Sequence, residues 1–564
     1  MINPIPGRWR WPLLHVALFL VGIYLYSLLV EFVGGFSTQV MYRQWPEALL
    51  VLYFYGLLYA LLRPSRWRPW LAAAPILLIY LTHDVFYLAY GKVFRFINVA
   101  ELPELLQILP PLYVVLLFLL FLAPVTVILW QIDYRRPLRI LLASLPLLLV
   151  VSLIKATPEA FATGFKTLVY EIVKYSDGKS VETNGRLAMM LYREAEREGV
   201  LRAIQPYLNR PGYDKAFTGE VERIRPHLQA RNVHLLILES FLDPRLFHDL
   251  KLSREPVHPD FAALFGDQLG LSRSPLFGGA TSQAEFEVLC GVPAMEQLSS
   301  IEFNTFTGAP ARCLPDFLGR LGYRVTASNA YKPNFFNTQP AYRGMGFAEQ
   351  YFSREFLPRE PTYLTFGDPG LEEYIFDGDL LPQNLAFVRR HLAEHPGQPL
   401  FNYLLTIFGH TPHNEDLDKR PRIIKVETPH NDEHLERVVN HFYYRTEALA
   451  AYVRELIALD PDSLILLVSD HVPPLQFGPP TYKALGYMGN IEGSHFYNRI
   501  AILDRGRPVT YPPLRHFDFP DLIVDTLTGG RYCATAECDY LSTTKPPRED
   551  YADQYLALMA HASE

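Results

Sequence analysis

Long apolar runs dominate the first 156 residues of the chain. Five stretches of 15 residues or more carry no charged residue: Pro12–Val30, Ala48–Leu62, Pro69–His83, Leu105–Ile132 and Ile140–Ile154. A helix needs about 20 residues to cross a bilayer, so the three shortest runs must borrow a flanking turn. A helix buried in a soluble core is the alternative for one isolated short run. Five runs so close together predict five membrane spans and a lipid bilayer as partner.

Arginine residues between the runs orient these spans. Three clusters fall on one side of a five-span arrangement: Arg8 and Arg10; Arg63, Arg66 and Arg68; Arg135, Arg136 and Arg139. Cytoplasmic loops carry an excess of Lys and Arg, so this side is predicted to be cytoplasmic. The first run has no small-x-small cleavage site after it, which favours an anchor over a signal peptide. The chain is therefore expected to be a multi-pass inner-membrane protein with a periplasmic C-terminal part.

The overall composition hides this division. The chain has 564 residues, 49% of them hydrophobic, and a net charge of -7. Residues 1–156 carry +6 and the remainder carries -13. The acidic remainder argues against a nucleic-acid partner. His83 and Asp84 lie near the outer end of the third run, where a hydrated interfacial position is favoured over a functional one.

The chain after the fifth run changes character twice. Residues 157–230 read as a mostly helical connector, and the mixed apolar and charged stretch Gly185 to Val200 predicts an amphipathic helix along the outer leaflet. From residue 231 onward, three short apolar runs predict strands buried on both faces, as in an α/β sheet: Val233–Leu238, Leu400–Ile407 and Ser463–Val468. Ligands of such sheets collect beyond the carboxyl ends of the strands.

Chemically active side chains follow these strands. Glu239 follows the first strand, and Asp470 with His471 follows the third. Carboxylates and an imidazole are suitable ligands for a divalent cation, although an acidic residue at the end of one strand is more often a cap. Two such strand ends together make a metal site as well supported as caps. His410 follows the second strand, where it could bind a phosphate oxygen or protonate a leaving group. A surface histidine is the alternative.

A glycine-rich turn supplies a candidate nucleophile. Thr281 follows Gly278-Gly279-Ala280, and Ser282 with Glu285 has the spacing of a capping box that would start a helix. The free amides of a helix start suit a phosphate, and a nearby metal would activate the Thr281 hydroxyl. An ordinary capped turn is the alternative.

The order of these motifs resembles the lipoteichoic acid synthase family. The motifs are Glu239-Ser240, Gly278-x-x-Thr281-Ser282-x-x-Glu285-Phe286, His410 and Ser469-Asp470-His471. That family consists of membrane-anchored phosphoglycerol transferases of the alkaline phosphatase/sulfatase-like superfamily. The resemblance covers nearly the whole chain. It implies a five-helix transmembrane domain over residues 1–156, a helical connector over 157–230, and an extracytoplasmic α/β sulfatase-like catalytic domain over 231–564.

The resemblance also implies roles for individual residues. Thr281 would be the nucleophile, and it would bind one divalent ion (Mn, Mg or Zn) together with Glu239, Asp470 and His471. His410 would contact phosphate. The headgroup segment departs from the family, because Asn329 replaces a His and Thr338, after Asn337, stands where an Arg belongs. His495 is a candidate replacement.

The function implied is transfer of phosphoglycerol from a phospholipid donor, phosphatidylglycerol, to a glycan or lipid-linked acceptor through a phospho-threonine. Phosphoethanolamine transfer to lipid A or a glycan is one alternative, and a catalytically silent membrane sensor or scaffold is another. A sulfatase would need Cys/Ser-x-Pro-x-Arg, and the nearest match, Cys313 to Phe317, lacks the Arg. Sulfate ester hydrolysis is therefore not expected.

All four cysteines lie in the predicted outer domain. Four cysteines allow three disulfide connectivities. Cys290–Cys313 with Cys533–Cys538 is the simplest pairing, and free buried thiols are the alternative.

Overall fold

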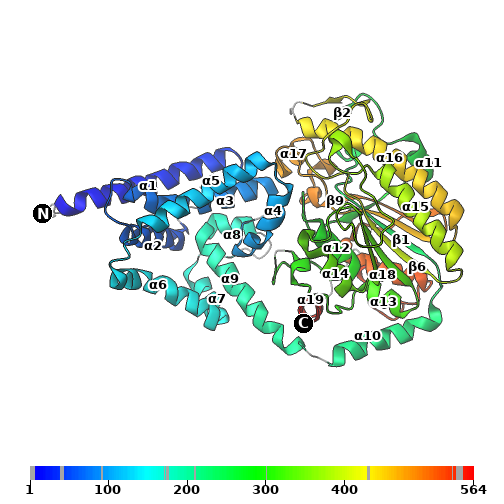
Figure 1. Ribbon diagram of the computed structural model, residues 1–564, viewed down its shortest axis with the longest axis horizontal. Helices are drawn as coiled ribbons and strands as arrows, with labels where there is room; N and C mark the ends of the chain where they lie inside the picture. Colours follow the sequence, from blue (N-terminus) through cyan, green and yellow to red (C-terminus); the bar gives the residue numbers. More distant parts are fainter. Residues whose placement is uncertain are drawn as a thin grey trace. The chain divides into compact units, whose positions relative to one another are not determined.

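The structure is a computed structural model of the chain (Figure 1). It describes residues 7–37, 43–90, 93–169, 172, 177–208, 211–299, 301–428, 432–536, 538–541 and 550–564, without the side chains of residues 7–13, which include Arg8 and Arg10, and of residues 101, 104, 108, 177 and 211–213. The chain divides into two compact units, Met1–Arg202 and Ala203–Glu564. The division falls inside the predicted connector.

The N-terminal unit is mainly helical in its described residues, and it also has one isolated β-bridge, between Leu62 and Ile132. Its helices are α1 (Gly7–Phe32), α2 (Trp45–Leu61), α3 (Arg68–Tyr90), α4 (Leu102–Ile108), α5 (Pro111–Gln131), α6 (Pro137–Ala156), α7 (Pro158–Leu168), α8 (Asp177–Asn184) and α9 (Arg186–Ala203). Four of the described helices are long and apolar enough to cross a membrane, namely α1, α3, α5 and α6, while α2 has 17 residues. The fourth predicted run is split into α4 and α5, because Pro110 and Pro111 interrupt it.

The start of α9 lies against the apolar helices α2 and α3. Glu47 of α2 accepts hydrogen bonds from the backbone amides of Leu187 and Ala188 at 3.0 and 2.8 Å. Arg186 forms a bidentate pair with Asp84 of α3, at 2.6 and 3.0 Å. Asp84 is thus buried and paired, and does not take the hydrated interfacial position that the sequence favoured.

The C-terminal unit is an α/β domain. Its strands are β1 (Val233–Leu238), β2 (Lys251–Leu252), β3 (Gly270–Arg273), β4 (Arg324–Asn329), β5 (Glu349–Phe352), β6 (Leu400–Leu405), β7 (Val426–Glu427), β8 (Leu464–Ser469), β9 (Tyr497–Asp504), β10 (Arg507–Val509) and β11 (Leu514–Arg515). Its helices are α10 (Pro211–Ile224), α11 (Pro259–Phe265), α12 (Thr281–Cys290), α13 (Leu314–Arg320), α14 (Thr338–Met345), α15 (Asp377–Glu394), α16 (Glu433–Leu459), α17 (Pro479–Ala484), α18 (Phe519–Leu527) and α19 (Tyr551–Ala562).

One mixed sheet organises this unit. Its strand order is β11-β3-β9-β8-β1-β6-β4-β5, with β10 paired to β9. The central strands β8, β1 and β6 are parallel and fully buried, as their apolar sequences predict. Helices α15 and α16 cover one face of the sheet, and α12 and α18 lie on the other (Figure 1). All three predicted strands are therefore confirmed, to within two residues at their ends.

Both simplest disulfides form. Cys290–Cys313 joins the end of α12 to the residue before α13, and Cys533–Cys538 closes a short loop after α18. The first disulfide fixes the far end of the helix that begins with Thr281.

Candidate active site

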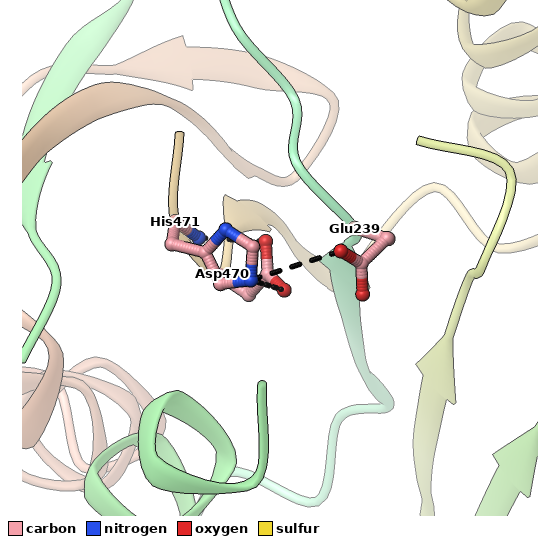
Figure 2. Close-up of side chains that lie close together, drawn as sticks. All are labelled: Glu239, Asp470 and His471. Atoms are coloured by element: carbon pink, nitrogen blue, oxygen red, sulfur yellow. Dashed lines mark hydrogen bonds and ion pairs between the residues drawn. The ribbon is translucent and has the colours of Figure 1, made fainter. Parts of the chain in front are cut away.

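Parallel pairing of β1 and β8 brings the first and third predicted motifs together. Leu238 pairs with Ser469, so the residues that follow, Glu239 and Asp470, leave the sheet side by side. His471 Nε2 lies 3.2 Å from Asp470 Oδ2 and 3.7 Å from Glu239 Oε1 (Figure 2). All three side chains are buried. One ligand atom from each lies within 4.8 Å of the others, which is close enough for a shared metal ion.

Thr281 completes the group from the first position of α12. Its Oγ1 lies 3.0 Å from Glu239 Oε2 and 2.9 Å from Asp470 Oδ2. A hydroxyl has one proton, so it can donate to only one of these two carboxylates at a time. Burial and then the charge of Asp470 raise the pKa of Glu239, and burial raises the pKa of Asp470 to about 6.

The histidine tautomer adds a further lone pair to this group. His471 Nδ1 lies 3.0 Å from the carbonyl oxygen of Val472, which can only accept, so Nδ1 carries the proton. In the neutral imidazole, His471 Nε2 then turns its lone pair toward Glu239 and Asp470. Two carboxylates, a hydroxyl oxygen and an imidazole nitrogen thus converge with too few protons to share. This set of side chains fits one divalent cation, and its mixed oxygen and nitrogen donors accept Mn, Mg or Zn.

The turn before Thr281 matches the predicted helix start, but the capping box is wrong. Ala280 is in the left-handed conformation at the N-cap position, and no side chain caps the helix. Glu285 points into the core, where it accepts hydrogen bonds from Tyr342 Oη at 2.5 Å and Tyr403 Oη at 2.6 Å. A capping box requires its hydroxyl residue at the N-cap, whereas Ser282 is already inside the helix. Burial raises the pKa of Glu285 to about 7.

The predicted histidines occupy two different surroundings. His410 Nδ1 lies 2.6 Å from the carbonyl oxygen of Thr411, and its ring packs edge-on against Tyr374. The preceding residue, Gly409, lies against the carbonyl oxygen of Glu239, which places His410 near Glu239. His495 packs edge-on against Phe277, the residue before the glycine pair, and burial lowers its pKa.

The two predicted asparagines have internal partners. Asn329 accepts from the backbone amide of Tyr331 at 2.8 Å and donates to Tyr342 Oη at 3.2 Å. Asn337 Nδ2 donates to two backbone carbonyls, those of Phe303 and Phe306, both at 2.7 Å. Asn329 therefore helps to hold the tyrosine bound to Glu285, and Asn337 holds its own loop. A headgroup role for either asparagine stays a prediction.

A buried ion pair behind Glu239 was missed from the sequence. Arg445 of α16 donates to the carbonyl oxygen of Glu239 at 2.7 Å and to Asp377 Oδ2 at 2.6 Å. Thr406 Oγ1 accepts the Glu239 amide at 3.2 Å, so the Glu239 peptide is held at both ends. The nearby Gly409 has no side chain where this carbonyl passes. The only sequence signal was a glycine just beyond a predicted strand.

A mixed α/β sheet with a hydroxyl and candidate metal ligands beyond its carboxyl edge is the arrangement that the family resemblance predicts. The family model described as Sulfatase matches residues 231–497. This region is therefore a sulfatase-like domain, and the resemblance to the alkaline phosphatase/sulfatase-like superfamily is confirmed.

Individual relatives are more distant. A protein of Rhizobium meliloti (strain 1021), provisionally described as a cyclic beta-1,2-glucan modification protein, is 28% identical over 269 residues, which are 47% of this chain and 39% of that protein. The match thus spans less than half of the relative.

Among solved structures, Streptococcus pyogenes phosphoglycerol transferase GacH in complex with sn-glycerol-1-phosphate has a TM-score of 0.48 at 17% identity, over 65% of this chain and 92% of that one. Lipoteichoic acid synthase LtaP from Listeria monocytogenes has a TM-score of 0.44 at 17% identity, over 55% and 77%. The C-terminal periplasmic domain of Escherichia coli EcEptC has a TM-score of 0.35 at 15% identity, over 53% and 82%.

Proposed function

We propose that this protein is a membrane-anchored transferase that moves a phosphoglycerol headgroup from phosphatidylglycerol to a hydroxyl of a glycan or a lipid-linked sugar. The observation that carries this proposal is the position of Thr281 Oγ1, within 3.0 Å of both Glu239 and Asp470 at a helix start. A threonine cannot become the formylglycine that a sulfatase uses. Its hydroxyl can instead take up a phosphoryl group directly.

The reaction is a double displacement at phosphorus. Thr281 Oγ1 forms a bond to the donor phosphorus, its proton passes to one of the two carboxylates at 2.9–3.0 Å, and the bond to the diacylglycerol oxygen breaks. His410, which follows the glycine packed against Glu239, protonates that leaving oxygen. An acceptor hydroxyl then attacks the phosphorus of the phospho-threonine and gives its proton to His410. The bond from phosphorus to Thr281 Oγ1 breaks, and the carboxylate returns its proton to that oxygen. A divalent ion bound by Glu239, Thr281, Asp470 and His471 would lower the pKa of the hydroxyl and offset the phosphate charge.

The acceptor is proposed to be a glucan. The name of the Rhizobium meliloti relative assigns it to modification of a cyclic beta-1,2-glucan, which is a polymer rich in free hydroxyl groups. A periplasmic domain would meet such a polymer. Phosphoethanolamine transfer is the second candidate, because Asn329 and Thr338 replace the His and Arg of the family's headgroup segment.

The test uses the purified full-length protein with phosphatidylglycerol or phosphatidylethanolamine, with and without Mn²⁺, followed by intact mass spectrometry. We expect a phosphoglycerol adduct that Thr281→Ala abolishes and that Ser282→Ala, which removes the neighbouring hydroxyl, retains. A phosphoethanolamine adduct would establish the second candidate. No adduct and no diacylglycerol from either lipid would instead favour a catalytically silent sensor or scaffold.

A further inference from the structure

Two loops of the N-terminal unit are joined by backbone pairing at one end of the apolar helices. Leu62, after α2, forms an antiparallel bridge with Ile132, after α5. The amide of Arg63 donates to the carbonyl oxygen of Gln131 at 2.8 Å. This bridge links the loop between α2 and α3 to the loop between α5 and α6. Each loop carries one of the arginine clusters noted in the sequence, so the bridge gathers two clusters at one place.

Few carboxylates of the described residues neutralise these arginines. The six residues are Arg63, Arg66, Arg68, Arg135, Arg136 and Arg139. Within the described part of the chain, the one ion pair among them joins Arg136 to Asp133 at 3.2 Å. Arg68 donates to the carbonyl oxygen of Tyr59 at 2.6 Å, and its buried Nη2 has no hydrogen-bond partner among the described residues.

An open groove of about 770 Å³ lies along the start of α6. Arg135, Arg136 and Arg139 line it together with Leu138 and Leu142, and all five side chains are exposed. Leu142 lies about one helical turn beyond the arginines, toward the apolar middle of α6. The groove therefore has a cationic end and an apolar end. An amphiphile with an anionic head and an acyl chain has the same division.

Exposed aromatic residues indicate at which level of a membrane this groove would lie. Trp67 and Trp70 stand at the start of α3, and Trp130 and Tyr134 at the end of α5 and just after it; each is at least 57% exposed. Trp and Tyr are enriched at the level of lipid headgroups. The arginines next to them lie at the same ends of the same helices. Phosphates are thus the anions within their reach.

We propose that these two loops and the start of α6 form a binding site for the headgroup of an anionic phospholipid. Guanidinium groups bind phosphate in a bidentate manner, and the leucines of α6 would contact the acyl chain. An excess of arginine on the cytoplasmic side would by itself serve only orientation. Orientation does not require a backbone bridge that gathers two clusters around a groove. The site belongs to the N-terminal unit and does not depend on the proposed transferase reaction.

The test is native mass spectrometry of the full-length, delipidated protein in detergent with equal amounts of phosphatidylglycerol and phosphatidylethanolamine. A Thr281→Ala background prevents turnover of the lipids. Each basic residue near a membrane surface contributes a several-fold preference for anionic lipid. We therefore expect the Arg135→Gln/Arg136→Gln/Arg139→Gln variant to lose at least tenfold in preference for phosphatidylglycerol at this site.

Arg359→Gln/Arg389→Gln/Arg390→Gln removes the same charge from exposed positions of the C-terminal unit and should keep the preference. Equal loss in both triple variants, or an unchanged preference in the first, would overturn the proposal. Displacement of the lipid by an equal concentration of inorganic phosphate would also overturn it, because the site would then bind free anions. A further measurement compares unfolding midpoints: phosphatidylglycerol should raise the midpoint of the Thr281→Ala protein more than that of the α6 triple variant in the same background, and an equal rise in both would contradict the site.

Discussion

Gly409→Ala is expected to disable the candidate metal site without changing any ligand. A Cβ at this position would lie 1.9 Å from the carbonyl oxygen of Glu239 and 2.5 Å from Arg445 Nη1. Real Cβ atoms essentially never approach a heavy atom closer than 3.0 Å. The Glu239 carbonyl or the Gly409 backbone must therefore move by at least 1.1 Å. Neither neighbour yields easily, since the carbonyl is backbone and Arg445 is held by a buried carboxylate.

This displacement is large compared with the tolerance of a metal site. Ligand distances in such sites hold to within about 0.2 Å. Changes to groups that orient a ligand typically weaken metal binding by roughly 10–100-fold. A shift above 1 Å places Gly409→Ala at the upper end of this range, with a loss of metal affinity near 100-fold, or about 2.7 kcal/mol. A misplacement of about 1 Å also costs on the order of 100-fold in rate.

The assay is isothermal titration of the metal-free, full-length protein with Mn²⁺, combined with the initial rate of diacylglycerol release. Gly219→Ala is the matched control, because Gly219 lies in α10 with nothing within 4 Å of its added Cβ. The control should bind Mn²⁺ as the unmodified protein does. If Gly409→Ala bound Mn²⁺ within twofold of the unmodified protein, the reasoning about the Glu239 carbonyl would be refuted.

Three further substitutions test separate parts of the structure. Arg445→Lys loses the guanidinium fork and should weaken Mn²⁺ binding about 10–100-fold, whereas Arg324→Lys, in a bidentate pair with Glu349 at the start of β4, should not; equal effects would contradict a positioning role. Protonated Glu285 contributes stability that is fully present below pH 4.5, its pKa in the unfolded chain, and that is lost as the pH rises through its folded pKa of about 7. Glu285→Gln should therefore flatten the decline of the unfolding midpoint between pH 5 and 8. An unchanged slope would refute this explanation. Asp84→Ala leaves Arg186 buried without its carboxylate and should cost about 3–5 kcal/mol, seen as a lower midpoint in detergent; a midpoint within 1 °C would exclude it.

The convergence of Glu239 and Asp470 could be predicted because two local sequence patterns combine with one rule of sheet topology. Short apolar runs predicted buried strands, and buried parallel strands place their following residues at a common edge. The pairing of Leu238 with Ser469 then puts Glu239 beside Asp470. Thr281 could be found as well, because two glycines before a helix start are a local signal. The family resemblance identified the side chains that surround Thr281.

What the sequence could not supply depends on contacts between distant segments. Arg445 lies in the middle of a long helix, 206 residues from the carbonyl that it holds, and no local pattern distinguishes it from a solvated arginine. Asp84 meets a partner 102 residues away, so its depth alone suggested an interfacial position. Glu285 was misread because the same spacing serves a capping box and an inward-facing carboxyl. Only the positions of Tyr342 and Tyr403 decide between these two.

The candidate site is built at a cost to stability, which the contacts around it must offset. Ser240, directly after Glu239, and Ala280, directly before Thr281, both have left-handed backbone angles, with φ of 47° and 60°. Such residues cost about 1–3 kcal/mol each and persist only where neighbours enforce them. Asp470 Oδ1 accepts the Ser240 amide at 2.7 Å, so a predicted metal ligand also holds the strained turn. Buried carboxylates facing one another add to the cost. The ion pair behind Glu239 and the disulfide at the end of α12 therefore serve the same end: they hold in place a group of side chains that would relax apart if their backbones were free.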